Sequence, residues 1–494
     1  MAATDEKPSL KLKTARTIKW NTIDRFGTQL LYLVVGVVLA NVLSQEEFGL
    51  VGVLLIFQAF ATILTDGGFG MALLQKKEPR QRDFSTVFWF NLCVSLLIYA
   101  VLWLSAPLIA RFFHGDQRLI PLSRWLFLSF VVYGLSLVQG VRLMKEMNVR
   151  QIAVANIAGL ICGGAIGVWL ALAGYGAWAL VWQTLANAAV RTSWLWIAGH
   201  WRPSLTFSRS SLRHILPVGL GTLSSQVLNT ASQYAYNFVI GGYYSIRAVG
   251  IYTQADKWSK MGSATMIQII TSSFVPLLSR FSDDAATHRR YITRINRFTA
   301  LILFPAMTGL CLIGAPLFHT LFGHKWDEAI PLFQILAIRG IPVVLIQLYY
   351  TYAVSLGRSK AMVAIEIVKD SLIFAAILLT VSSYSVETLV WGQFGASAAT
   401  LAVAAAIASS ITGYPLRRMA ADLIPFMLLS FAACAAAWAA GAWIATPWLR
   451  LAAELAAGLA AYLLLLRLFR IPELPEMTAY LFGRFRRHPA PKNN

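Results

Sequence analysis

Apolar segments long enough to cross a lipid bilayer alternate with short polar connections along almost the whole chain. A transmembrane helix needs about 20 predominantly apolar residues. No polar piece between these segments is long enough for a soluble catalytic domain. The pattern therefore predicts an all-α integral membrane protein with about 14 transmembrane helices. These begin near Trp20, Phe48, Phe84, Leu119, Ile152, Trp178, Ile215, Val249, Phe298, Ile330, Met362, Val386, Leu423 and Leu451.

The composition agrees with a membrane protein. Of the 494 residues, 57% are hydrophobic and 13% are charged, whereas ordinary soluble domains have about 25% charged residues. The net charge of +20 would suggest nucleic acid as a partner of a soluble chain, but no basic stripe interleaved with aromatic residues lies on a soluble module. The four cysteines lie in apolar runs without metal-site spacing, so we expect them to pack, and we expect no metal and no cofactor.

Basic residues are unequally distributed between the two sets of alternate loops. Loops rich in Lys and Arg resist translocation and stay in the cytoplasm. Thirty of the 42 basic residues lie in the N-terminal segment, in every second loop and in the C-terminal tail, and the opposite loops hold five. We therefore expect both termini in the cytoplasm, with the chain in a bacterial inner membrane. The apolar run 23–43 is too long for a cleaved signal peptide, so we expect a retained first span.

Short motifs recur in the same order at nearly one offset. Three pairs are separated by 209 or 210 residues, and a weaker pair by 201. The repeat contains six spans, an even number, so both copies cross the membrane in the same sense and are related by an axis along the membrane normal. The three pairs are Ser105–Leu108 with Gly314–Leu317, Ile120–Leu122 with Ile330–Leu332, and Leu180–Trp182 with Leu389–Trp391; the weaker pair is Phe48-Gly49 with Val249-Gly250.

The repeat predicts two six-helix lobes followed by two further helices. Transporters with this organisation bind substrate where the lobes meet. We therefore expect a polar cleft between the lobes. The predicted parts are a cytoplasmic N-terminal segment at 1–19, the first lobe at 20–200, the second lobe at 211–411, two appended helices at 420–470 and a basic cytoplasmic tail at 471–494.

The stretch Gly250–Lys260, with the sequence GIYTQADKWSK, brings three charges into a predicted span. Charge at membrane depth persists mainly where it faces protein, a partner charge or water. Asp256 and Lys260 are four residues apart and can neutralise each other on one helical face. Lys257 then has no local partner, so it can receive an anionic substrate or pair with a carboxylate on another helix.

Three arginines within predicted spans are further candidates for an anionic substrate. Arg25 lies about one turn inside the first span and could meet a phosphate headgroup, or its side chain could simply extend to the interface. Arg124 and Arg339 lie in the fourth and tenth spans, which are counterparts in the two lobes. Arg191 lies close to the inner end of its span, where we interpret it as an orientation anchor.

Carboxylates in the predicted spans are candidates for proton or sodium coupling. Glu366, Lys369 and Asp370 form an i, i+3, i+4 cluster that could couple ions or merely compensate itself. Asp66 opens the run Asp66-Gly-Gly-Phe-Gly70, whose glycines predict a break in the helix, so Asp66 marks either an ion site or a plain helix terminus. Asp24 and Asp256 complete this set of coupling candidates.

No nucleophile elbow, Walker loop, zinc motif or dinucleotide-binding turn is present in the sequence. His114, His319 and His324 fall in short loops on the predicted outer side and lack a carboxylate constellation expected of an active site. The sequence therefore favours a protein that is not an enzyme.

Three stretches resemble the Wzx-type polysaccharide flippases of the multidrug/oligosaccharidyl-lipid/polysaccharide exporter superfamily, particularly its colanic-acid and exopolysaccharide branch. The order of six, six and two spans also resembles that family. The stretches are LANVLSQEEFGLVGV at Leu39–Val53, TDGGFGMALLQ at Thr65–Gln75 and VGIYTQADKWS at Val249–Ser259.

The resemblance implies export of oligosaccharide units linked to a polyprenyl pyrophosphate, from the cytoplasmic to the outer leaflet, by alternating access. It implies that basic residues in the cleft hold the pyrophosphate, and that the partners are this lipid-linked substrate, the bilayer and other polysaccharide assembly proteins. In this sequence the basic candidates are Arg25, Lys257, Lys260, Arg124 and Arg339.

Two alternatives stay open at the level of the sequence. The same architecture could carry a peptidoglycan precursor or small cationic drugs, although a drug exporter is expected to show an excess of acidic residues in its cleft. A membrane-bound polymerase, ligase or acyltransferase is expected to carry a sizeable outer loop with catalytic residues, and the short loops of this chain disfavour it.

Overall fold

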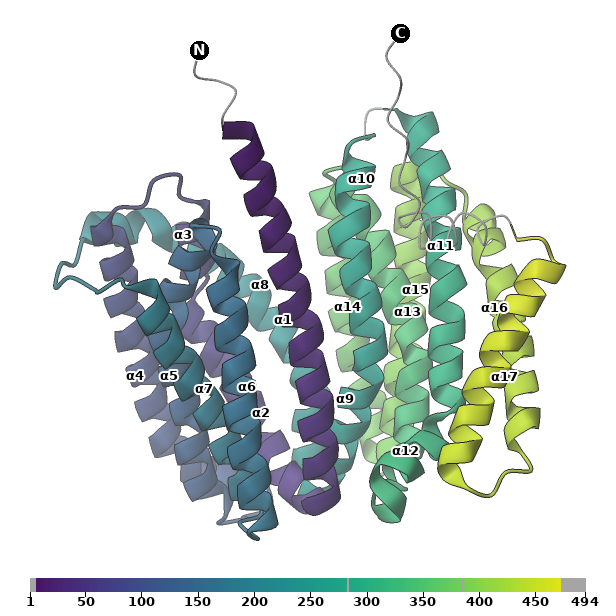
Figure 1. Cartoon of the computed structure of the whole chain (residues 1–494), viewed down its shortest axis with the longest axis horizontal. Helices are drawn as coiled ribbons and strands as arrows, with labels where there is room; N and C mark the ends of the chain where they lie inside the picture. The colour runs from purple at the N-terminus through teal and green to yellow at the C-terminus, as the bar shows by residue number, and fades with distance from the viewer. Residues whose placement is uncertain (1–5, 282–283, 384, 472–494) are drawn as a thin grey trace. The chain divides into compact units, whose positions relative to one another are not determined.

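The computed structural model describes residues 6–281, 284–383 and 385–471, and within these ranges the chain forms helices and no β-strand (Figure 1). Contacts between Cα atoms divide the chain into two compact units, residues 1–253 and 254–494. The predicted lobe boundary at 200–211 lies before the helix that follows it, whereas the contacts group that helix with the first unit. Each unit is described by itself.

The first unit is a bundle of long helices. Helices α6 and α7 pack along each other, α5 packs on α7 and on α4, and α1 packs on α6. The short helix α3 lies against α5 and α8. The helices are α1 (Glu6–Val42), α2 (Gln45–Asp66), α3 (Phe69–Gln75), α4 (Gln81–Phe112), α5 (Leu119–Lys145), α6 (Val149–Leu172), α7 (Ala177–Gly199), α8 (Arg209–Tyr243) and the first turns of α9 (Ile246–Ile269).

The predicted helix break at the Asp66 motif is confirmed. Helix α2 ends at Asp66, and Gly67 and Gly68 follow with φ values of 52° and 71°. This left-handed backbone conformation is accessible to glycine without the steric cost that a side chain imposes. The chain then continues as α3, so the end of α2 carries an offset short helix instead of one straight span.

The second unit packs its helices around α13. Helix α15 lies along α13 and α14, and the appended pair α16 and α17 packs together, with α16 on α11. Tyr349, Tyr352 and Met307 are buried in its main apolar core. The elements after α9 are the π-helical turn η1 (Ile270–Phe274), α10 (Val275–Ser279), α11 (Ala285–Leu312), α12 (Gly314–Phe322), η2 (Gly323–Trp326), α13 (Ala329–Ser355), α14 (Ser359–Thr380), η3 (Val381–Ser383), α15 (Val386–Thr412), α16 (Leu416–Gly441) and α17 (Pro447–Leu468).

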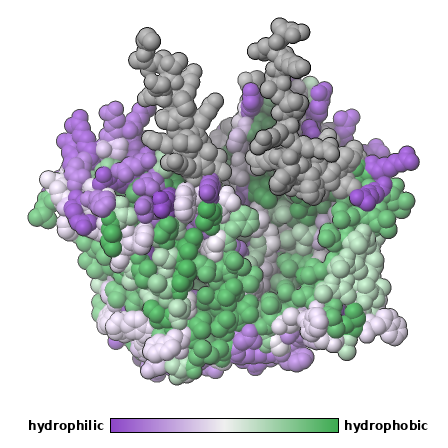
Figure 2. All heavy atoms as spheres, in the orientation of Figure 1, coloured by the Kyte–Doolittle hydropathy of each residue, from purple (hydrophilic) through white to green (hydrophobic). Residues whose placement is uncertain are grey.

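The prediction of an all-α membrane protein is confirmed. Eleven described helices, some with their short extensions, are long and apolar enough to span a bilayer. Figure 2 shows hydrophobic residues over the sides of the helices and hydrophilic residues at their ends. Large apolar side chains such as Leu104, Leu378 and Leu379 are exposed there, as expected of surfaces that face lipid. The chain is therefore a multi-pass membrane protein.

The number of 14 spans stays a prediction. Every predicted window contains a described helix of at least 22 residues. Three of these helices, α7, α8 and α14, are not among the eleven that meet the length and hydropathy requirement. Polar and charged residues inside them, such as Arg191 in α7 and Lys369 in α14, lower their hydropathy.

The weaker repeat pair, Gly49 and Gly250, lies at the crossing of α2 with the first turns of α9. A Cβ atom added to Gly49 would overlap the carbonyl oxygen of Ile246, and one added to Gly250 would overlap that of Gln45. Ile246 and Gln45 are separated by the same 201 residues as the two glycines. The two copies of the motif therefore contact each other reciprocally, and only glycine fits at either position.

Candidate functional site

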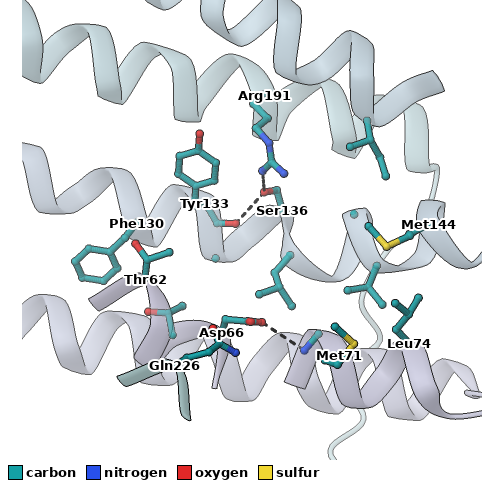
Figure 3. A pocket seen from close by; sticks show the side chains of 17 residues that line it. Thr62, Asp66, Met71, Leu74, Phe130, Tyr133, Ser136, Met144, Arg191 and Gln226 are labelled. Carbon is teal, nitrogen blue, oxygen red and sulfur yellow. Dashed lines mark hydrogen bonds between the residues drawn. The ribbon is translucent and has the colours of Figure 1, made fainter. Parts of the chain in front are cut away.

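A pocket of about 530 Å³ in the first unit contains the largest group of predicted polar residues that the described chain brings to one cavity. Helices α2, α3 and α5 supply most of its wall, and α6, α7 and α8 supply one residue each. Most lining side chains are apolar. In Figure 3, Asp66 and Gln226 lie on one side of the pocket, and Arg191, Tyr133 and Ser136 lie on the other. A largely apolar cavity with a few convergent polar groups is typical of a ligand site.

Asp66 reaches this pocket because it is the last residue of α2. Its Oδ1 accepts a hydrogen bond of 3.4 Å from the backbone N–H of Gly70, across the break formed by Gly67 and Gly68. Asp66 forms no ion pair within the described part of the chain. A half-buried carboxylate that lacks a fixed cation and faces a cavity can accept a proton or a small cation from it.

Arg191 enters the same pocket from α7 and is held by neutral partners. Its Nε donates to Asn156 Oδ1 at 2.9 Å, and its Nη1 donates to Ser136 Oγ at 2.9 Å. Its guanidinium carbon lies 5.0 Å from the centre of the Tyr133 ring. These contacts fix the orientation of the guanidinium group and leave it as a positive charge in the pocket wall.

Asp24 is connected to Arg191 through Asn156. The amide nitrogen of Asn156 donates to both carboxylate oxygens of Asp24, at 3.2 and 3.1 Å, while its amide oxygen accepts from Arg191. The half-buried Asp24 on α1 therefore compensates the charge of Arg191 through one amide group. Its neighbour Arg25 is exposed and forms no ion pair with the described residues.

The predicted pair on α9 is confirmed, and it lies in the second unit. Lys260 Nζ lies 2.6 Å from Asp256 Oδ2. Lys257 is half-buried, its ammonium lies 5.3 Å from the centre of the Trp258 ring, and it pairs with no carboxylate of the described chain. The structure thus leaves Lys257 as the cation of this segment that is available to an anion.

Arg124 and Arg339 have separate environments. The guanidinium carbon of Arg124 lies 4.6 Å from the centre of the Trp103 ring in the first unit, a stacking contact that stabilises a cation on an aromatic face. Arg339, in the second unit, donates through Nε to Ser397 Oγ at 3.0 Å. Neither arginine forms an ion pair within the described ranges.

The cluster on α14 is at least partly self-compensated. Lys369 pairs with Glu366, and its ammonium lies 3.8 Å from Asp370. Asp370 is buried, whereas Glu366 keeps 40% of its side chain exposed. These contacts use the charge of Lys369 within its own helix, so a role in ion coupling stays a prediction.

Two of the outer-loop histidines meet a carboxylate. Asp327 lies 2.9 Å from His319 Nε2 and 3.1 Å from His324 Nδ1. Nitrogen and oxygen atoms of these three residues lie within 4.8 Å of one another, so together they could hold a metal ion. His114 lies in the other unit and is exposed.

The sequence analysis missed the role of Arg191 in the pocket. Of the coupling candidates, the structure places Asp66 in the pocket wall and connects Asp24 to it through Asn156 and Arg191. The available signal was a pair of polar residues, Asn156 and Arg191, in two consecutive apolar helices that were free to pack together. Proximity to the span end outweighed that signal.

Comparison with known proteins agrees with this architecture. The family model described as "Polysaccharide biosynthesis protein" matches residues 38–331. The succinoglycan biosynthesis transport protein ExoT of Rhizobium meliloti is 28% identical over 68% of each chain. The lipopolysaccharide biosynthesis protein WzxC of Escherichia coli is 27% identical over 67% of this chain and 68% of its own. Among solved structures, the lipid II flippase MurJ in an inward closed conformation has a TM-score of 0.74 at 13% identity, over 95% of this chain and 100% of its own.

Proposed function

Because the chain belongs to the polysaccharide biosynthesis protein family, we propose that it moves oligosaccharide units linked to a polyprenyl pyrophosphate across the bacterial inner membrane. The direction is from the cytoplasmic to the outer leaflet, with both termini in the cytoplasm, for the synthesis of exopolysaccharide, O-antigen or capsule. The family match over residues 38–331 carries this proposal. ExoT, a relative over two thirds of the chain, is itself described as a transport protein.

The charges of the spans support an anionic substrate. A pyrophosphate with its sugars cannot cross about 30 Å of hydrocarbon unaided. Lys257, Arg25 and Arg339 carry positive charge at or within helices that cross the membrane and have no carboxylate partner in the described chain. Together with Lys260 and Arg124 they are the proposed headgroup ligands, and the structure adds Arg191 as a sixth candidate.

The membrane potential can supply part of the driving force. Moving about two negative charges outward through 100 mV releases on the order of 4 to 5 kcal/mol when the cytoplasm is negative. Movement by alternating access, in which the substrate site opens to one side of the membrane at a time, then needs no ATPase module. The proposed protein is a transporter and not an enzyme.

We further propose that the Asp66 pocket takes up the coupling ion, either H⁺ or Na⁺. Asp66 faces the cavity without a cation, and the Gly67–Gly68 break beside it lets α3 change its angle to α2. Asp24 belongs to this site through the Asn156 bridge. Asp256 and the cluster Glu366, Lys369 and Asp370 are weaker coupling candidates because their charges are paired locally.

A gene deletion tests the proposed function. Cells that lack this chain should accumulate complete polyprenyl-linked repeat units in the cytoplasmic leaflet, measured by the protection of their sugars from an added impermeant glycosidase. Incomplete units, or complete unpolymerised units in the outer leaflet, would instead point to an enzyme of assembly. Accumulation of a peptidoglycan precursor, with normal polysaccharide, would identify the other lipid-linked substrate.

A further inference from the structure

A second cavity of the first unit is lined almost entirely by basic and hydroxyl side chains. Its volume is about 540 Å³, and it lies where the connection between α3 and α4 meets the beginning of α8. In Figure 1 this is the end of the unit that carries α3. The lining residues are Lys76, Arg82, Arg209, Ser210, Ser211 and Arg213, none of which lines the Asp66 pocket.

The positive charge of this basic pocket exceeds its local compensation. Lys76 Nζ pairs with Asp83 Oδ2 at 2.9 Å, and the Asp83 side chain is only 1% exposed. Arg82, Arg209 and Arg213 form no ion pair with any residue that the structure describes. Arg209 and Arg213 are four residues apart on α8, a spacing at which like charges repel each other by a few tenths of a kcal/mol. Three guanidinium groups therefore face one cavity without a carboxylate.

The walls of the basic pocket are held in place by the segment that precedes α8. The backbone N–H of Ser208 donates to Thr86 Oγ1 at 3.0 Å, and that of Ser204 donates to Ser85 Oγ at 3.0 Å. Trp89 Nε1 donates to the carbonyl oxygen of Ser204 at 2.9 Å. These bonds tie the segment to the first turns of α4 and so fix the beginning of α8 beside the α3–α4 connection.

The other wall is held from a third helix. The ammonium group of Lys145, at the end of α5, donates to the backbone carbonyl oxygen of Lys76. The Lys76 side chain is fixed by its contact with Asp83. The cations of the basic pocket thus come from two elements whose backbones are restrained, and a ligand that binds them pays less for ordering than it would on a flexible loop.

We propose that the basic pocket binds the phosphate group of a membrane lipid. Guanidinium groups bind phosphate oxygens through parallel pairs of hydrogen bonds, and Ser210 adds a hydroxyl donor at the rim. By the distribution of basic loops the pocket faces the cytoplasmic leaflet, where anionic lipids gather. The phosphate can belong to an anionic phospholipid or to a polyprenyl pyrophosphate. The site goes beyond the proposed transport function, because its binding of phosphate does not require transport.

Cytoplasmic loops are rich in basic residues in any inner-membrane protein, so charge alone does not make a site. What separates these residues from an ordinary basic loop is that they surround one cavity. The test must therefore compare them with other basic residues of the same predicted side. Arg358 and Lys360 are exposed residues at the beginning of α14 and are suited to that comparison.

The experiment measures binding of short-chain probes to the purified full-length protein in a neutral detergent by titration calorimetry. The probes are dioctanoyl phosphatidylglycerol and farnesyl pyrophosphate, with dioctanoyl phosphatidylcholine as the neutral comparison. Arg209→Gln with Arg213→Gln should weaken at least one anionic probe by about tenfold or more, since one charge-assisted hydrogen bond is worth about that factor. Arg82→Gln, on a different helix, should weaken the same probe independently.

The matched control is Arg358→Gln with Lys360→Gln, which removes the same charge and should leave the affinity within about twofold. Weakening of only phosphatidylglycerol assigns the site to a phospholipid, and weakening of only farnesyl pyrophosphate assigns it to the transported class of lipid. Equal weakening by the control pair, or equal affinity for the neutral probe, overturns the proposal. A wild-type protein that binds the probe but does not flip lipid-linked sugars would refute the transport function alone.

Discussion

Asp24 and Arg191 are expected to stabilise each other through Asn156, and a double-mutant cycle can measure this coupling. The cycle consists of Asp24→Asn, Arg191→Gln and the double variant. Both replacements remove a charge and keep a side-chain amide that can hydrogen-bond. The single variants each leave one charge without its counterpart among these helices, whereas the double variant removes both charges at once.

The magnitude follows from the geometry of the bridge. Asn156 lies 3.1 Å from an Asp24 oxygen and 2.9 Å from Arg191 Nε. With the width of one amide group, the two charged groups are at most about 8 Å apart. At an effective dielectric constant of about 20, opposite charges at that distance attract by about 2 kcal/mol. The double variant should therefore be about 2 kcal/mol more stable than the sum of the two single effects predicts.

The assay is the free energy of unfolding in mixed micelles, titrated with a denaturing detergent. The control cycle combines Asp24→Asn with Arg25→Gln. Arg25 is adjacent in sequence but exposed, so solvent screens its charge and its coupling should stay below about 0.5 kcal/mol. If the effects of Asp24 and Arg191 add within about 0.5 kcal/mol, or if their coupling equals that of the control, Asn156 does not link the two charges and the reasoning is refuted.

Three other outcomes are expected. Asp66→Asn should slow flipping in membrane vesicles because the cavity loses its carboxylate, and wild-type rates would remove Asp66 from ion coupling. Lys257→Glu should abolish polysaccharide export from cells while the protein stays inserted and abundant, whereas Lys257→Arg should retain export; normal secretion by the Glu variant would remove Lys257 from the substrate site. Gly250→Ala should destabilise the protein by about 1–3 kcal/mol through overlap with the Gln45 carbonyl, whereas Gly309→Ala meets no neighbouring atom and should not; equal thermal unfolding midpoints would contradict this.

Local features of the fold could be predicted from the sequence because their causes are local. Apolar length gave the helices, since lipid leaves few other ways to satisfy the backbone. The Gly67–Gly68 break depends on two residues that accept a left-handed backbone. The pair of Asp256 with Lys260 depends on the spacing of one helix face, and the structure confirms it.

The sites could be predicted only in part because they depend on packing between distant helices. Nothing in the sequence near Arg191 shows that Asn156 of another helix lies within hydrogen-bonding distance. The basic pocket is a similar case, because Lys76 and Arg209 belong to loops that were counted as evidence for orientation. Their meeting depends on the segment before α8 folding back onto α4.

The reciprocal crossing of Gly49 with Gly250 bears on the origin of the chain. A contact in which position i of one copy meets position j of the other, and j meets i, is the hallmark of a twofold symmetric dimer. Here a single polypeptide makes that contact with itself. A half-length ancestor pairing with its own twin would need just one glycine codon for this crossing, whereas the fused gene carries two codons that guard the same gap and mutate separately.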